Sequence, residues 1–122
     1  VNKTSILFIT HNLGIVREIA DRIIVMYAGT IVEEGLVDEV FKNPLHPYTK
    51  GLIQSLPEFN IKNNKKIQPI PGNIPSMDNL PTGCYFHPRC TFATDACKIK
   101  KPKLEKISHN RKTRCFEFSR LM

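Results

Sequence analysis

Residues 83–97 read GCYFHPRCTFATDAC, and residues 109–115 read HNRKTRC. These stretches contain all the cysteines of the chain, which are separated by gaps of five, six and seventeen residues: Cys84, Cys90, Cys97 and Cys115. Little apolar sequence lies between them, and the surrounding chain is rich in proline and lysine. A hydrophobic core alone does not hold such a region in shape, so we expect a cross-link through the four sulfur atoms.

The spacing of the cysteines ranks three kinds of cross-link. Structural zinc sites usually contain cysteine pairs with about two to four residues between them, and none of the three gaps is that short. An iron–sulfur cluster with four thiolate ligands is larger and takes its ligands from several loops, so wide and uneven gaps suit it better. Two disulfides, in any of three connectivities, are the alternative in an oxidising compartment. We therefore place a cluster first and zinc second.

Length, composition and charge describe a chain with two regions. The chain has 122 residues, of which 41% are hydrophobic and 24% charged, as in an ordinary soluble domain. Residues 1–60 carry five Lys and Arg against seven Asp and Glu, whereas residues 61–122 carry thirteen against four. No apolar run reaches the roughly twenty residues of a membrane helix, and no export signal opens the chain. We expect a cytosolic protein, which weakens the disulfide alternative.

The first third of the chain predicts an α/β fold. Residues 5–10 form a continuous apolar run, typical of a strand buried on both faces of a parallel sheet, and residues 22–27 are of the same type. Residues 13–20 have the apolar spacing of a short crossover helix. An Ala-Gly pair then predicts a hairpin turn into a surface strand at residues 30–33. One strand–helix–strand unit cannot cover both faces of a buried sheet, so we expect the tail end of a larger α/β domain.

Two more helices and a link follow. Residues 36–41 have the apolar stripe of a short helix. Pro47 can open a second helix at its first turn. The buried side of that helix is predicted to consist of Tyr48, Leu52, Ile53 and Leu56. Residues 58–66 are polar and lysine-rich, which predicts a flexible link.

His11 is a candidate ligand-binding residue because it directly follows the apolar run at residues 5–10. In open α/β sheets, ligands bind at the carboxyl ends of the strands. An imidazole there can donate a hydrogen bond to an anionic oxygen. The alternative for a lone histidine is a turn residue or a helix cap.

Residues 5–35 resemble the end of the nucleotide-binding domain of ATP-binding-cassette (ABC) transporters. The resemblance comprises an apolar strand, Thr-His, a short helix, Ala-Asp-Arg, a second apolar strand, Tyr-Ala-Gly and Ile-Val-Glu-Glu-Gly, in this order. In that family the switch-loop histidine contacts the γ-phosphate of ATP, and the resemblance assigns this role to His11. The family often has aspartate at the next position, in a dimer-interface loop. This chain has Asn12 there, so the resemblance supports the phosphate contact more than the interface contact.

The rest of the chain narrows the resemblance to one subfamily of ABC transporters. His46-Pro47-Tyr48, the Ile-Pro-Gly at residues 70–72 and the four cysteines in their order resemble the oligopeptide/dipeptide-importer subfamily of ATP-binding subunits, in the form of the first of two paired subunits. In that subfamily the four cysteines are associated with a [4Fe–4S] cluster.

The resemblance also implies a division of the chain and a fold class. Residues 1–57 would be the C-terminal part of a P-loop ABC ATPase domain of α/β class, and residues 58–68 a linker. Residues 69–122 would be a small, loop-rich, metal-stapled extension. We expect a structural role for its cluster, because four cysteine ligands leave no open coordination site, and we rank a redox or iron-sensing role below it.

The function implied by the resemblance is that of an ATP-binding subunit, which uses ATP and Mg²⁺ to energise uptake of oligopeptides, dipeptides or a related solute such as nickel chelates. Its implied place is the cytoplasmic face of a prokaryotic cell membrane. Its implied partners are a second ATP-binding subunit, transmembrane permease subunits and, indirectly, a solute-binding protein. The chain contains no G-x-x-x-x-G-K-[ST] phosphate loop, no signature motif and no Walker B motif, so we expect no ATP hydrolysis from it alone.

An alternative function is a small four-cysteine metal module that binds nucleic acid. Residues 98–114 hold eight Lys and Arg and one acidic residue, and a basic stripe beside a metal site can bind phosphates. Phe86, Phe92 and Phe116 would then stack on bases. However, basic runs also form solvated surface or offset the charge of a thiolate cluster, and prolines interrupt any recognition helix. We rank this function below the transporter.

Overall fold

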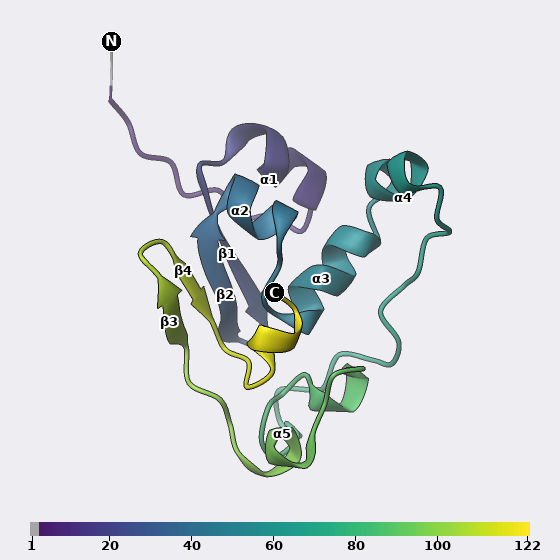
Figure 1. Ribbon diagram of the computed structural model, residues 1–122. Coiled ribbons are helices and arrows are strands. Elements are labelled where there is room, and N and C mark those ends of the chain that lie inside the picture. The colour runs from purple at the N-terminus through teal and green to yellow at the C-terminus, as the bar shows by residue number, and fades with distance from the viewer. Residues whose placement is uncertain (1–2) are drawn as a thin grey trace.

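The structure is a computed structural model that describes residues 3–122, and its centre is a four-stranded antiparallel sheet (Figure 1). The strands are β1 (Arg22–Tyr27), β2 (Thr30–Leu36), β3 (Glu105–Ser108) and β4 (Arg111–Thr113). They lie in the order β1-β2-β4-β3, and each neighbouring pair is antiparallel. The sheet therefore combines a hairpin from the first third of the chain with one from its C-terminal part.

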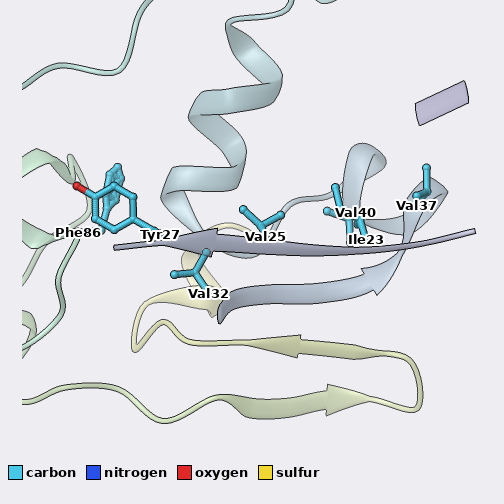
Figure 2. Close-up of a cluster of buried hydrophobic side chains, with 7 residues drawn as sticks. All are labelled: Ile23, Val25, Tyr27, Val32, Val37, Val40 and Phe86. Atoms are coloured by element: carbon cyan, nitrogen blue, oxygen red, sulfur yellow. The ribbon is translucent and has the colours of Figure 1, made fainter. Parts of the chain in front are cut away.

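The predicted hairpin turn is confirmed. Ala28 and Gly29 have φ values of 48° and 74°, the positive values that a type I′ turn requires at both central positions. Along β1, Ile23, Val25 and Tyr27 are buried while the residues between them are exposed. Figure 2 shows the three buried side chains along one face of β1, with valines of β2 and α2 around them.

The three predicted helices are confirmed as α1 (Leu13–Ile19), α2 (Val37–Lys42) and α3 (Pro47–Gln54). The Asn12 side chain caps α1 by accepting a hydrogen bond from the backbone N–H of Ile15 at 3.2 Å. All three helices contribute side chains that pack against the buried face of β1. On α3, Ile53 is buried while Tyr48 and Leu52 are half-buried against the core.

The prediction of buried parallel strands is wrong in two respects. Residues 5–10 form no strand, and Ile6, Leu7 and Ile9 are 82%, 84% and 88% exposed. An apolar run becomes a buried strand only where neighbouring strands pair with it, and no other part of residues 3–122 does so. The second run, β1, is buried on one face only, because helices cover only that face.

The strand predicted at residues 30–33 is present as the first part of β2, but the prediction that it lies on the surface is wrong. Both Val32 and Glu33 are almost completely buried, at 4% and 0% exposure. A register shift between Val25 and Met26 adds one residue to β2, and a bulge of this kind changes the side to which side chains point. In addition, β4 pairs with β2 on its other edge, with Glu33 opposite Thr113.

The predicted flexible link at residues 58–66 is partly helical. Its first two thirds, residues 58–63, lie in α4 (Pro57–Asn63), which Pro57 opens at the first turn. The Asn60 side chain stabilises this helix by donating hydrogen bonds to the carbonyls of Gln54 and Leu56, at 2.7 and 2.9 Å. Residues 64–86 contain neither helix nor strand.

The C-terminal part contains short elements joined by loops. They are the 3₁₀ helix η1 (His87–Arg89), the helix α5 (Asp95–Ile99), the β3–β4 hairpin and the 3₁₀ helix η2 (Phe118–Arg120). Figure 1 shows α5 and its loops at one end of the structure and α1 at the other. Among residues 3–122, no helix has both the length and the apolar character that crossing a bilayer demands.

Candidate functional site

The four cysteines, distant in sequence, line one cavity. All four are free thiols: Cys97 is buried, and Cys84, Cys90 and Cys115 are half-buried. The cavity is closed by aromatic and proline side chains, two histidines and one glutamate: Phe86, Phe92, Phe116, Pro47, Pro102, His46, His87 and Glu117. The fold thus brings together the four side chains that sequence spacing singled out.

Cys84 and Cys97 are held together by their backbones. The N–H of Cys84 donates to the carbonyl of Cys97 at 2.8 Å, and the hydroxyl of Thr82 donates to the carbonyl of Lys98 at 2.9 Å. Gly83 permits this approach, because a Cβ at its position would lie 2.2 Å from the Cys97 carbonyl oxygen and its φ is 72°. The glycine before the first cysteine is therefore part of the site.

The other two cysteines come from separate elements. Cys90 ends η1, where its N–H donates to the carbonyl of His87 at 3.2 Å. Cys115 follows β4 and is positioned through its neighbour Arg114. The Arg114 backbone N–H donates to Val32 at 2.8 Å, and its guanidinium donates to Ile31 at 2.7 Å. One cavity wall is thereby attached to the central sheet.

Burial makes these thiols weak acids. It raises the pKa of Cys84, and it raises the pKa values of Cys90 and Cys115 to about 11 and about 12. Charge repulsion from the neighbouring cysteines adds to all three increases, because several thiolates share one cavity. Cys84, Cys90 and Cys115 are therefore neutral thiols at pH 7, and a cation would be needed to stabilise them together as thiolates.

The cavity is not a preformed site for a single ion. Within residues 3–122, no group of three or more His, Cys, Asp or Glu side chains has the arrangement that a metal ion needs. In a tetrahedral zinc site each sulfur lies about 2.3 Å from the ion, so the ligand sulfurs are within about 4 Å of one another. In a four-iron cluster each thiolate binds a different iron, so the sulfurs lie farther apart. Four cysteine sulfurs are the donor set of either group, a structural zinc ion or a four-iron cluster.

His46 is a site residue whose position the sequence did not reveal. Its ring is 1% exposed and stacks on Phe86, with ring centroids 5.8 Å apart and an interplanar angle of 15°. Phe86 in turn contacts Tyr27 and Tyr48, at centroid distances of 5.2 and 5.4 Å. Figure 2 shows Phe86 beside Tyr27 at one end of β1. An aromatic cluster therefore connects the hydrophobic core to the cysteine cavity.

A buried ion pair fixes the C-terminal hairpin to the rest of the structure. Arg111 of β4 donates to the carboxylate of Glu33 on β2 at 2.6 Å, with side-chain exposures of 9% and 0%. Glu33 also accepts hydrogen bonds from the backbone N–H groups of Leu45 and His46, at 2.8 and 3.1 Å. Burial raises the pKa of Glu33, and these donors oppose the increase. The pair thus connects β4 to the segment that carries His46. The sequence signal that could have indicated this buried pair is Glu33, a glutamate within an apolar stretch of a strand.

His11 lies away from the cysteine cavity. It is exposed, two residues before α1, and Figure 1 shows α1 and α5 at opposite ends. The adjacent turn is fixed by Thr10, whose hydroxyl oxygen accepts from the N–H of Asn12 at 3.0 Å. The structure therefore separates the two predicted sites and leaves the His11 ring accessible.

The residues of the alternative nucleic-acid site are only partly on the surface. Six lysines between residues 98 and 112 are exposed. Phe86, in contrast, is 3% exposed within the aromatic cluster, so its ring is not available for stacking on a base. Phe92 is half-buried beneath Lys50 and Arg120, whose cationic groups lie 5.2 and 5.4 Å from its ring centroid. Phe116 is the one of the three that is exposed.

The family model and the similar proteins point to the same family. Residues 32–97 match the family model of the oligopeptide/dipeptide transporter, C-terminal region. The oligopeptide transport ATP-binding protein AppD of Bacillus subtilis is 50% identical over 113 residues, which are 93% of this chain and 34% of that protein. The dipeptide transport ATP-binding protein DppD of Haemophilus influenzae is 46% identical over 111 residues, 91% of this chain and 33% of that protein.

A third relative, from Brucella ovis and provisionally named a peptide import ATP-binding protein, is 48% identical over 120 residues, 94% of this chain and 36% of that protein. The chain thus spans about a third of the length of these curated relatives. The family model covers more than half of the chain and includes the segment with His46 and three of the four cysteines. The chain therefore belongs to the family of oligopeptide/dipeptide transporter C-terminal regions.

Proposed function

We propose that this chain is the C-terminal part of the ATP-binding subunit of an ABC importer that takes up oligopeptides or dipeptides. The observation that carries the proposal is the similarity to peptide-transport ATP-binding proteins along more than nine tenths of the chain. In the proposed subunit, residues 1–57 belong to the nucleotide-binding domain, and residues 69–122 form the extension after the linker at 58–68. The subunit acts at the cytoplasmic face of the membrane with a second ATP-binding subunit and permease subunits.

The exposed apolar surface supports a place within a larger domain. Residues 5–10 present Ile6, Leu7 and Ile9 to solvent, and β1 is an edge strand whose outer face exposes Ile24 and Met26 by 50% and 56%. Apolar residues gathered in this way usually mark a surface that other structure covers. In the proposed subunit, further strands and helices of the nucleotide-binding domain cover it.

For His11 we propose the role of the switch histidine. Its imidazole donates a hydrogen bond to the γ-phosphate of ATP bound by the rest of the domain. Loss of that phosphate removes the hydrogen-bond acceptor, which helps the paired subunits to separate and so couples hydrolysis to transport. The accessible ring and the rigid cap that Asn12 forms on α1 support this role, since together they present the ring from a fixed turn.

Substitution in the complete subunit tests the switch. The variant His11→Ala is expected to lose ATP-driven peptide uptake, measured with labelled peptide in proteoliposomes, while the metal content of the subunit stays unchanged. His109→Ala is the matched control, because His109 is an exposed histidine in the β3–β4 turn. Uptake at the wild-type rate by the His11 variant would refute the assignment.

For the cysteine cavity we propose a [4Fe–4S] cluster with a structural role, with zinc as the alternative. Cys84, Cys90, Cys97 and Cys115 would hold it. When bound, the cluster supplies positive charge from its irons that stabilises four thiolates in place of neutral thiols. The chain's own part is to gather ligands from η1, α5 and the end of β4, so that metal binding adds to the free energy of folding.

Metal analysis of anaerobically purified protein tests the cofactor. The wild-type chain is expected to contain iron and acid-labile sulfide in about equal amounts, with a visible absorption that is lost on oxidation. Cys115→Ser is expected to lose most of the iron, whereas Ser119→Ala, a change at an exposed residue nearby, should retain it. Zinc without sulfide would favour the alternative, and a chain free of both metals would refute the proposed centre.

A further inference from the structure

The tautomer of His46 follows from its hydrogen bonding. His46 is the N-cap of α3, where its Nδ1 accepts the backbone N–H of Tyr48 at 3.1 Å. A nitrogen that accepts a hydrogen bond cannot carry the proton, so the neutral ring holds its proton on Nε2. The ring is neutral at physiological pH, because burial lowers its pKa to about 3. His46 therefore presents an N–H group from the far side of its ring.

This N–H group has no partner within the described part of the chain. The Nε2 atom is completely buried and makes no hydrogen bond with residues 3–122. The backbone of Arg114 is near enough to affect the pKa of the ring but does not have hydrogen-bond geometry with Nε2. A buried donor left unpaired costs about 1–3 kcal/mol, and such groups are rare enough to need a specific explanation.

The surroundings of the ring indicate which acceptor is missing. His46 lines two cavities, and both contain Cys84. One of them is the cavity of the four cysteines, whose other walls are mostly aromatic rings and prolines. Its one carboxylate, Glu117, pairs with Arg120 at 3.5 Å and makes no hydrogen bond with Nε2. A thiol sulfur accepts hydrogen bonds only weakly. Metal binding turns thiols into thiolates, which accept charge-assisted hydrogen bonds that are about twice as strong.

We infer that His46 is a positioning residue of the cysteine centre, whose Nε2–H donates a hydrogen bond to a sulfur of the bound group. The inference rests on the proposed function, because it requires that the cavity holds its metal centre. The same histidine then links two structures: Nδ1 caps α3, and Nε2 stabilises negative charge on sulfur. Hydrogen bonds to sulfur raise the reduction potential of an iron–sulfur centre, because they stabilise the reduced, more negative state.

Two substitutions separate the two functions of the ring. His46→Asn retains a side-chain oxygen near the position of Nδ1, so it can still cap α3, but it is too short to reach the cavity. His46→Gln places an amide N–H near the position of Nε2 and loses the cap. A purely structural histidine predicts that the glutamine variant is the more damaging of the two. The inferred role predicts that His46→Asn changes the reduction potential of the metal centre more than His46→Gln does.

The experiment is a redox titration of the complete, anaerobically purified subunit, followed by electron paramagnetic resonance, with iron and sulfide analysis of each sample. We expect His46→Asn to lower the equilibrium constant for reduction at least about tenfold, which is about 59 mV for one electron, and His46→Gln to restore most of it. Urea denaturation of both variants controls for folding.

The outcomes separate this inference from the proposed function. Wild-type protein without iron or zinc would refute the proposed centre itself. Wild-type protein that contains iron and sulfide, with the same potential in both variants, would refute the role of His46 while leaving the centre intact. If the metal is zinc, the corresponding readout is competition with a chelator, in which His46→Asn should hold zinc at least about tenfold more weakly. Equal retention by the wild type and the variant would overturn the inference.

Discussion

Removal of the Arg111 side chain is expected to loosen the C-terminal hairpin and with it one wall of the cysteine cavity. The variant Arg111→Met keeps most of the side-chain volume but removes the charge. It breaks the 2.6 Å contact with Glu33 and also the hydrogen bond from the guanidinium to the carbonyl of Asn43 at 2.9 Å. Glu33, which is fully buried, is left with a charge that neutral donors alone stabilise, among them the backbone N–H groups of Leu45 and His46.

The magnitude follows from the burial of the pair. Breaking a buried ion pair from one side costs about 3–5 kcal/mol, because the remaining charge stays out of water. A chain of this length is expected to have about 6–18 kcal/mol of stability in total. With a urea dependence of about 2 kcal/mol per molar, the unfolding midpoint should fall by about 1.5–2.5 M.

The assay is urea unfolding at pH 7, followed by circular dichroism and tyrosine fluorescence. Arg22→Met is the matched control, since Arg22 pairs with Glu34 at a similar distance of 2.9 Å but is 45% exposed. Exposed pairs contribute about 0–1 kcal/mol, so its midpoint should move by less than about 0.5 M. The double variant Glu33→Gln/Arg111→Met should cost at least about 2 kcal/mol less than the sum of its single variants. Equal shifts for Arg111→Met and Arg22→Met would refute the reasoning.

Three further predictions concern the cavity and its surroundings. Gly83→Ala should lower the free energy of unfolding, measured by urea denaturation, by at least about 1 kcal/mol more than Gly72→Ala does. Both glycines have positive φ, but the new Cβ meets a carbonyl oxygen at 2.2 Å in the first and the flexible Arg89 side chain at 3.0 Å in the second. Stability should fall as pH drops from 6.5 towards about 3, because the unfolded chain binds a proton at His46 that the folded chain excludes. The free energy of unfolding should change by at most about 1.4 kcal/mol per pH unit. Urea midpoints measured across that pH range should show a smaller change in His46→Asn than in the wild type. In the metal-free chain, Cys90 and Cys115 should react with iodoacetamide at pH 7 at least about 100-fold more slowly than ordinary thiols, since their pKa values are about 11 and about 12. Mass spectrometry of the modified peptides measures the rates, and unfolding in urea should abolish the difference.

Elements that depend on neighbouring residues were predicted well from the sequence. The helix at residues 13–20 is present as α1, and the Ala28-Gly29 turn has the backbone angles that its residue types favour. Pro47 opens α3 as expected. In each case the deciding interaction spans at most a few residues, as in the cap that Asn12 forms on α1.

Predictions that depended on distant partners failed. Residues 5–10 have the composition of a buried strand, yet they lie exposed, because pairing and covering layers come from other parts of a sheet. Residues 30–33 were predicted at the surface, yet Glu33 is fully buried because β4 and Arg111 lie against it. No pattern within either segment indicates which distant residues will pair with it or cover it.

The candidate site, too, was predictable from the sequence in part and depends on long-range contacts for the rest. Spacing alone singled out the four cysteines as one set, since few other roles require four sulfurs in a loop-rich segment. That they line one cavity depends on long-range contacts, such as those of Arg114 with Ile31 and Val32. The place of His46 beside the cavity depends on its stacking with Phe86, forty residues later in the chain.

The sequence by itself determined the helices and the hairpin turn and singled out the four cysteines as a candidate set, because propensity, turn angles and side-chain chemistry belong to individual residues and their neighbours. The tertiary structure decided which faces are covered, where the Glu33–Arg111 pair is buried and which side chains surround the cysteines. Burial and charge pairing are properties of contacts between distant segments, and only the folded chain specifies them.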